Sequence, residues 1–173
     1  MMTEGTEPMD ATTRPKPLVL DSADDVHARA IARLQSERIA WFTTIRANGF
    51  PHAVPLWFLW LDDEVLILSE PGTVKARNVR GNPHVLVHLE AGPDGEQLTV
   101  LQGLAAISEE PTSAWLDRIG SAYGEKYAAG LASLNLTAET MAEQFTTVIR
   151  VVPSNVSPSC SNHSSRRVIL PSR

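Results

Sequence analysis

The chain has 173 residues, a formal net charge of −5, and 43% hydrophobic and 20% charged residues. These values are typical of one globular domain, and they exclude a general nucleic-acid-binding protein, which needs a cationic surface. No apolar run approaches the ~20 residues that cross a bilayer, no secretory signal is visible, and the single Cys160 cannot form an internal disulfide. The sequence therefore predicts a cytoplasmic protein without nucleic-acid or membrane partners.

The chain begins with a segment that is predicted to be a disordered leader, residues 1–17, because it is rich in Thr, Glu and Pro and has no periodicity. Residues 21–25 then offer an N-cap and an acidic first turn for a helix. Val26, Ala30 and Leu34 follow at helical spacing. This pattern predicts a helix that ends near Ser36 and covers one end of the core.

Most of the remaining chain is predicted to form strands, with few helices. Six segments are apolar, β-branched or aromatic and are separated by turn residues: 39–45, 51–60, 64–69, 84–90, 97–107 and 145–152. Hairpin-type links between them indicate antiparallel pairing, and closure into a barrel removes exposed edges. Helices are expected over 73–81 and 111–131 and from Thr137. The fold class is therefore mainly β with flanking helices, in a six-stranded antiparallel barrel.

The composition changes at the end of this region. From Pro153 onward Ser, Pro and Asn dominate, which predicts an irregular tail over 153–173 and leaves 18–152 as the folded domain.

The strand predicted over 51–60 is apolar on both faces, so both faces should be covered. One cover is the barrel core, and the other is a ligand, a second subunit, or both. Pro55 cannot donate to a ladder of hydrogen bonds, so it indicates an edge strand or a bulge.

An anion site is predicted where Gly72 and Thr73 begin a short basic helix, because a helix N-terminus presents unpaired N–H groups. Ser69 and Thr73 add hydroxyl donors. The helix spacing allows two sets of cations or amides, Lys75 with Asn78 or Arg77 with Arg80, and does not decide between them. A solvated basic helix without a ligand is the simpler interpretation.

No catalytic side chain is identified. His84 and His88 fall on one face of a predicted strand, about 13 Å apart by strand rise, and no third ligand accompanies them, so no metal site is expected. No nucleophile motif is present. A protein that holds a redox cofactor needs few such groups, since the cofactor carries the chemistry.

Two stretches resemble a known family. Residues 41–58 resemble the "T-x-R-x-x-G-x-P-H-x-x-P-x-W-F" pattern of the flavin- and deazaflavin-dependent oxidoreductases of the pyridoxamine 5′-phosphate oxidase-like superfamily. Residues 73–83 are similar to that family's "K-x-x-N-L-x-x-x-P" helix. The resemblance covers about residues 25–152 and implies an FMN-binding split barrel that forms a homodimer, with two cofactor sites at the interface.

The resemblance also implies a cofactor and its ligands. The cofactor would be the deazaflavin coenzyme F420, with FMN as the alternative. Val54, Pro55, Leu56 and Trp57 would border its ring. Ser69, Thr73, Lys75 and Asn78 would hold its phosphate, with Arg77 as a helper, and Gln102 with Gly103 would approach from the neighbouring subunit.

The chain departs from the family pattern twice. Residues 153–158 do not match the basic and aromatic segment that commonly follows the last strand. Val74 stands where FMN enzymes of the family often have a basic residue, and this difference points slightly away from FMN. The expected activity is hydride transfer from reduced F420 to an electron-poor small molecule such as a quinone, enone or tetrapyrrole. The alternatives are an FMN-dependent oxidoreductase, a non-catalytic flavin-, deazaflavin- or haem-binding protein, and a dimeric structural protein with an empty barrel.

Overall fold

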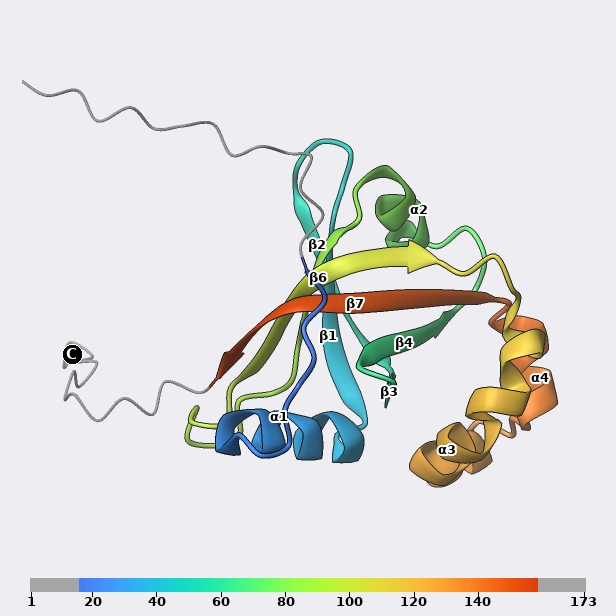
Figure 1. Cartoon of the computed structure of the whole chain (residues 1–173). Coiled ribbons are helices and arrows are strands. Elements are labelled where there is room, and N and C mark those ends of the chain that lie inside the picture. The colour runs from blue at the N-terminus through green and yellow to red at the C-terminus, as the bar shows by residue number, and fades with distance from the viewer. Residues whose placement is uncertain (1–15, 159–173) are drawn as a thin grey trace, which may run out of the picture.

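A computed structural model describes residues 16–158, which form a curled antiparallel sheet with helices around it (Figure 1). All but the last two residues of the predicted leader lie outside the described residues. The strands are β1 Ile39–Ile45, β2 Pro51–Trp57, β3 Leu59–Leu61, β4 Glu64–Ser69, β5 His84–His88, β6 Thr99–Ile107 and β7 Thr147–Pro158. The helices are α1 Asp25–Ser36, α2 Val74–Gly81, α3 Thr112–Ser133 and α4 Ala138–Gln144.

Side-chain caps fix where three of the helices begin, as their sequences predict. The Asp24 carboxylate accepts the N–H groups of Val26 and His27 at 2.9 and 3.0 Å at the start of α1. Thr137 and Thr140 form a reciprocal capping box at the start of α4. These bonds satisfy N–H groups that have no partner within the helix.

The sheet is a split barrel, because its two edges belong to one continuous segment. Its strand order is β2-β1-β5-β6-β7-β4-β3, and every neighbouring pair is antiparallel. Edge strands β2 and β3 are the two halves of the segment predicted as one strand, so the sheet curls until its ends meet across Phe58. The predicted fold class is confirmed, with seven strands in place of six.

A tyrosine hydroxyl causes the extra division. At Phe58, the Tyr127 Oη accepts the Phe58 N–H at 2.9 Å and lies 2.7 Å from the Phe58 carbonyl oxygen and 2.8 Å from that of Arg38. The side chain of α3 thus replaces the strand partner at this residue. The chain can then leave its pairing with β1 and begin its pairing with β4.

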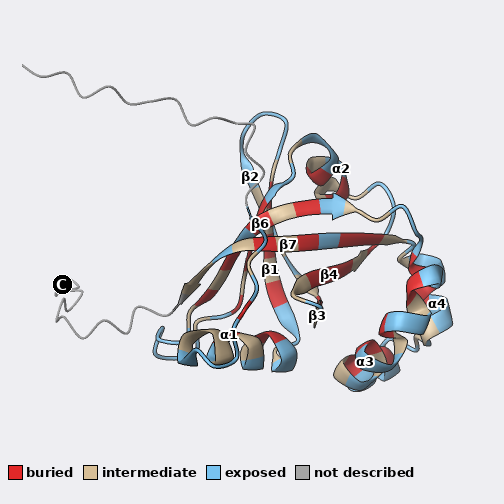
Figure 2. Cartoon of the chain, in the orientation of Figure 1, coloured by how far each residue is buried: buried red, intermediate tan, exposed pale blue. Residues whose placement is uncertain are grey.

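Two apolar cores lie on opposite faces of the sheet (Figure 2). The inner core fills the curl and is closed by α1 and α2; it includes Leu34, Phe42, Phe58, Ile67 and Ile149. The outer core lies between α3–α4 and strands β3, β4 and β7; it includes Leu66, Ile119, Tyr127, Met141 and Val148. Of the helices in residues 16–158, none is long and apolar enough to cross a bilayer.

Strand β2 is covered on one face only within the chain. Val54 and Leu56 alternate with Ala53 and Pro55, and the latter two are exposed. Within residues 16–158 no element covers Ala53 and Pro55, so the cover of this face by a ligand or a second subunit stays a prediction. The prediction that Pro55 lies in an edge strand is confirmed.

The last strand ends six residues later than predicted. β7 continues past Val152 to Pro158 and pairs with β6 through a bulge at Gln102 and Gly103. Gly103 permits the bulge, because a Cβ there would collide with the Val152 carbonyl oxygen. Residues 153–158 thus belong to the sheet and not to an irregular tail, whose remaining residues lie outside those described.

Candidate functional site

A small apolar cavity lies where β2 and β4 separate, with α3 and α4 as its other walls. Its volume is about 260 Å³. It is lined by Leu56 and Trp57 of β2, Leu68 of β4, Lys75 of α2, Tyr123 of α3, and Leu134, Leu136, Met141 and Phe145 of the segment from the end of α3 to the end of α4. Three predicted site residues, Leu56, Trp57 and Lys75, therefore meet here.

Trp57 is a fixed wall of this cavity. Its ring stacks on Tyr127 with the centroids 4.5 Å apart and the planes at 8°, and it also contacts Tyr123 at 6.3 Å. The indole also lies close to α3 at Gly130, where an added Cβ would lie 2.6 Å from two indole carbons. The indole therefore has little freedom to change its orientation.

Among the residues that line the cavity, Lys75 is the one with a charged side chain. It is half-buried and makes neither a hydrogen bond nor an ion pair with any described residue. Burial lowers the pKa of its ammonium group, and the nearby Glu70 carboxylate partly offsets this effect. Glu70 is itself held by the Gln144 Nε2 at 3.1 Å. A partly desolvated cation without a direct partner is suited to bind an anionic ligand.

The start of α2 is built as predicted, but its hydroxyls bond to each other. The Ser69 Oγ lies 3.0 Å from the Thr73 Oγ1, and Thr73 caps the helix by accepting the Ala76 N–H at 3.4 Å. Ser69 is 1% exposed. A ligand at this helix start would thus meet Lys75 and backbone N–H groups before it met these hydroxyls.

Other predicted phosphate ligands point elsewhere. The Asn78 Nδ2 donates to the Thr44 Oγ1 at 2.9 Å and so faces β1. The exposed Arg77 donates to the Gly72 carbonyl at 3.3 Å. Lys75 and Asn78 are therefore directed to different neighbours, although their spacing places them on one helix face. Val54 and Pro55 lie on β2 but do not line the cavity.

Gln102 is an exposed residue of β6. It lines a separate groove of about 400 Å³ together with Thr43, Ile45, His84 and Leu86 on β1 and β5. In the single chain it is thus not part of the Lys75 cavity. Within residues 16–158, no group of three or more His, Cys, Asp or Glu residues is placed to hold a metal ion.

The residues of α3 beside the cavity follow a pattern that is visible in the sequence. Aromatic or aliphatic residues recur every four positions at Trp115, Ile119, Tyr123, Tyr127 and Leu131. This spacing indicates one apolar face of α3. Nothing in the sequence indicated that this stripe would stack on Trp57, which is about 70 residues away.

The fold has many solved relatives at low identity. A conserved hypothetical protein of Mycobacterium tuberculosis has a TM-score of 0.64 and 23% identity, covering 93% of this chain and 98% of its own. An F420 reductase has a TM-score of 0.55 and 19% identity, covering 73% and 94%. The haem storage protein of Vibrio cholerae has a TM-score of 0.58 and 19% identity, covering 75% and 92%. These similarities show the fold alone.

No curated protein matches the chain. The family comparison is more specific than the structural ones. Residues 26–160 match the family model described as pyridoxamine 5′-phosphate oxidase. This range contains both sequence motifs, the strands of the split barrel and the residues that line the cavity. The chain therefore belongs to the pyridoxamine 5′-phosphate oxidase family.

Proposed function

We propose that this protein is an oxidoreductase that binds coenzyme F420 beside β2 and α2, with FMN as the alternative cofactor. Its substrate is an electron-poor organic molecule such as a quinone, an enone or a tetrapyrrole. The observation that carries the proposal is the Lys75 ammonium group, which is half-buried at the split of the barrel without a hydrogen-bonding or ion-pairing partner. A cofactor phosphate supplies the missing anion.

The cavity fits one end of such a cofactor. Small-molecule sites usually enclose ~300–1,000 Å³, so a volume of about 260 Å³ is too small for a complete dinucleotide-sized ligand. Lys75 and the first N–H groups of α2 suit a phosphate, and Leu56 and Trp57 offer an apolar wall to the group attached to it. The rest of the cofactor extends outside the cavity, along the uncovered edge of β2.

The bound cofactor supplies the hydride chemistry, and the chain supplies position and exclusion of water. Trp57 is held by stacking, so it orients whatever lies against it. Among the described residues that line the cavity there is no carboxylate, histidine or cysteine. We propose that any proton the reaction needs is taken from solvent.

We further propose that the chain forms a homodimer through the uncovered face of β2, β1, β5 and β6. Ala53 and Pro55 are exposed apolar residues of β2, and the Gln102 groove lies on the neighbouring strands of this face. Burial of this face in a second copy would also explain why β2 is apolar on both sides. Light scattering during size-exclusion chromatography tests the dimer directly, because a mass near 18.9 kDa would contradict it.

The experiment for the cofactor is a fluorescence titration with F420 and, separately, with FMN. Lys75→Ala should weaken binding of the preferred cofactor by ~1–3 kcal/mol, about 5- to 150-fold, which is the range for a charge-assisted hydrogen bond. Lys75→Arg should retain most of the affinity. Arg77→Ala is the matched control on the exposed side of the same helix and should change the affinity for the cofactor little.

The outcomes separate the alternatives. Preferential binding of FMN would keep the site and change the cofactor. Binding of hemin but of neither flavin would favour a haem-binding protein. Equal affinity of Lys75→Ala and the unchanged protein would remove Lys75 from the site and contradict the proposal.

A further inference from the structure

The Lys75 cavity contains a second polar group without a partner, the hydroxyl of Tyr123 on α3. The Tyr123 side chain is 5% exposed, and its hydroxyl makes no hydrogen bond to a described residue. Within residues 16–158, the fully buried side-chain nitrogen and oxygen atoms that lack a partner are the Arg33 Nε and the His52 Nδ1. The Tyr123 oxygen is not one of them, so it still reaches open space, and the space that this residue lines is the cavity.

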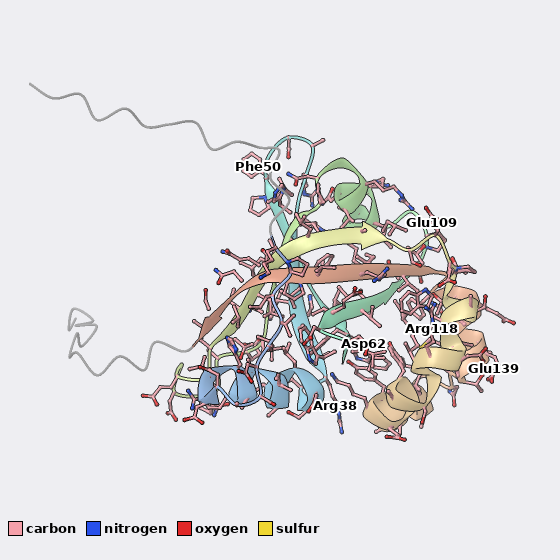
Figure 3. All side chains as sticks on the ribbon, in the orientation of Figure 1. Arg38, Phe50, Asp62, Glu109, Arg118 and Glu139 are labelled. Atoms are coloured by element: carbon pink, nitrogen blue, oxygen red, sulfur yellow. The ribbon has the colours of Figure 1, made fainter. Side chains whose placement is uncertain are left out.

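Tyr123 and Lys75 can both donate to an anion. Burial raises the pKa of the Tyr123 phenol, so the hydroxyl keeps its proton at neutral pH. Lys75 has no ion-pair partner among the described residues, and the nearby Glu70 is exposed and does not line the cavity. Glu139, at the start of α4, points away from the sheet (Figure 3). The residues that line the cavity thus provide two donors and no carboxylate.

The rest of the lining is apolar. It consists of two aromatic and five aliphatic or thioether side chains, which are Trp57, Phe145, Leu56, Leu68, Leu134, Leu136 and Met141. Leu134 is 58% exposed, so it forms part of the opening to solvent. An apolar cavity of ~150 Å³ can hold a benzene molecule. The volume of about 260 Å³ therefore admits a phenyl ring together with a short acidic side chain.

A carboxylate matches the two donors better than a phosphate does. Each of its two oxygen atoms can accept from one donor, and the cavity supplies one ammonium group and one hydroxyl. The backbone N–H groups that begin α2 suit a phosphate, but Thr73 and Val74 do not line the cavity. A cofactor phosphate on those N–H groups therefore leaves the part of the cavity beside Tyr123 open to another ligand.

We propose that the Lys75 cavity binds small aromatic carboxylic acids, with the carboxylate on Lys75 and Tyr123 and the ring among the apolar side chains. The proposal goes beyond the cofactor function, because it requires neither F420 nor FMN. The acid and the cofactor phosphate share Lys75, so the acid should raise the apparent dissociation constant of the cofactor. The cavity would then be a site at which such acids inhibit the enzyme.

Isothermal titration calorimetry of the full chain with 3-phenylpropanoate, at pH 7.5 and without cofactor, tests the site. Two related compounds separate the contributions, because 3-phenylpropanol lacks the charge and propanoate lacks the ring. Each should bind about tenfold or more weakly than 3-phenylpropanoate, since each loses one kind of contact. If propanoate or 3-phenylpropanol bound as tightly as 3-phenylpropanoate, the cavity would not recognise an aromatic acid and the proposal would be overturned.

Two substitutions test the donors. Lys75→Met should weaken the binding of 3-phenylpropanoate about 5- to 150-fold and Tyr123→Phe about 2- to 10-fold, the ranges for a charged and a neutral hydrogen bond. Arg77→Ala, on the exposed side of α2, is the control and should leave the affinity unchanged. Melting curves recorded by circular dichroism show that each variant is folded. Unchanged affinity in either Lys75→Met or Tyr123→Phe would overturn the proposed carboxylate contacts.

The result can be distinguished from that of the cofactor titration. Binding of 3-phenylpropanoate by a chain that binds neither F420 nor FMN would support the acid site and contradict the proposed oxidoreductase. Binding of a cofactor without any binding of 3-phenylpropanoate would do the reverse. If both bind but the acid does not change the affinity for the cofactor, competition for Lys75 is refuted.

Discussion

The hydroxyl group of Tyr127 should be a large single contribution to stability, and Tyr127→Phe removes it alone. The hydroxyl accepts the Phe58 N–H at 2.9 Å and has carbonyl oxygens of Phe58 and Arg38 at 2.7 and 2.8 Å. One proton can serve one carbonyl at a time, so the substitution orphans one buried N–H and one buried carbonyl. Each unsatisfied buried group costs ~1–3 kcal/mol, so the two groups together predict a loss of about 2–6 kcal/mol.

Urea denaturation followed by tryptophan fluorescence measures this loss, and Tyr123→Phe is the matched control. Tyr123 is also buried in α3 and stacks in the same aromatic cluster, but its hydroxyl makes no hydrogen bond to a described residue. Its loss should cost less than about 0.5 kcal/mol. At ~2–4 °C per kcal/mol for a chain of this size, a loss of ~2–6 kcal/mol should lower the melting temperature of Tyr127→Phe by ~4–24 °C. Equal stability of the two variants would show that the hydroxyl does not maintain the break in the strand.

Three further predictions concern the stability of the fold. Gly130→Ala should destabilise the fold by ~1–3 kcal/mol relative to Gly124→Ala in urea titrations, because its Cβ would meet Trp57 at 2.6 Å, whereas no atom lies within 4 Å of the Cβ at Gly124. A chain ending before residues 154–158 should unfold at lower urea than one ending after them, because they complete the pairing of β7 with β6; equal midpoints would show that the pairing contributes nothing. Because burial lowers the pKa of Lys126 to about 8, the unfolded chain binds more protons between pH 8 and about 10, and this group's contribution to the free energy of unfolding rises with pH there. Lys126→Met should flatten that rise, and an unchanged slope would contradict the assignment.

Above pH 10 the two buried tyrosines of α3 should reverse this trend. Burial raises the pKa of both phenol groups, so the unfolded chain loses protons first and the folded state loses stability as the pH increases. The combined contribution of Lys126 and the two tyrosines to the free energy of unfolding is therefore largest at a pH between the titration of the lysine and that of the tyrosines.

Local signals predicted the elements well. Asp24 and Thr137 begin their helices where capping preferences place them, and Pro55 lies in an edge strand because it has no N–H to donate. Local signals did not predict the extension of β7, because Ser and Pro are rare in strands. The partner strand and the bulge at Gly103 overcome that low propensity.

The candidate site was predicted only in part. Lys75, Leu56 and Trp57 meet in one cavity as the motifs indicated, because each lies on a short segment whose direction follows from helix or strand periodicity. Asn78 shares a helix face with Lys75 but is drawn to Thr44 by a hydrogen bond across about 34 residues of sequence. A contact of that kind depends on how the helix packs and not on its spacing.

By itself, the sequence determined the type and order of the elements, the edge position of β2 and the family, because each depends on neighbouring residues or on a motif. The tertiary structure alone decided where the long strand divides, which face of β2 stays uncovered and which cation lies in the cavity. These features depend on Tyr127 reaching Phe58 and on Gly130 admitting Trp57. Such contacts join segments about 70 residues apart, and only the packing of α3 against the sheet brings them together.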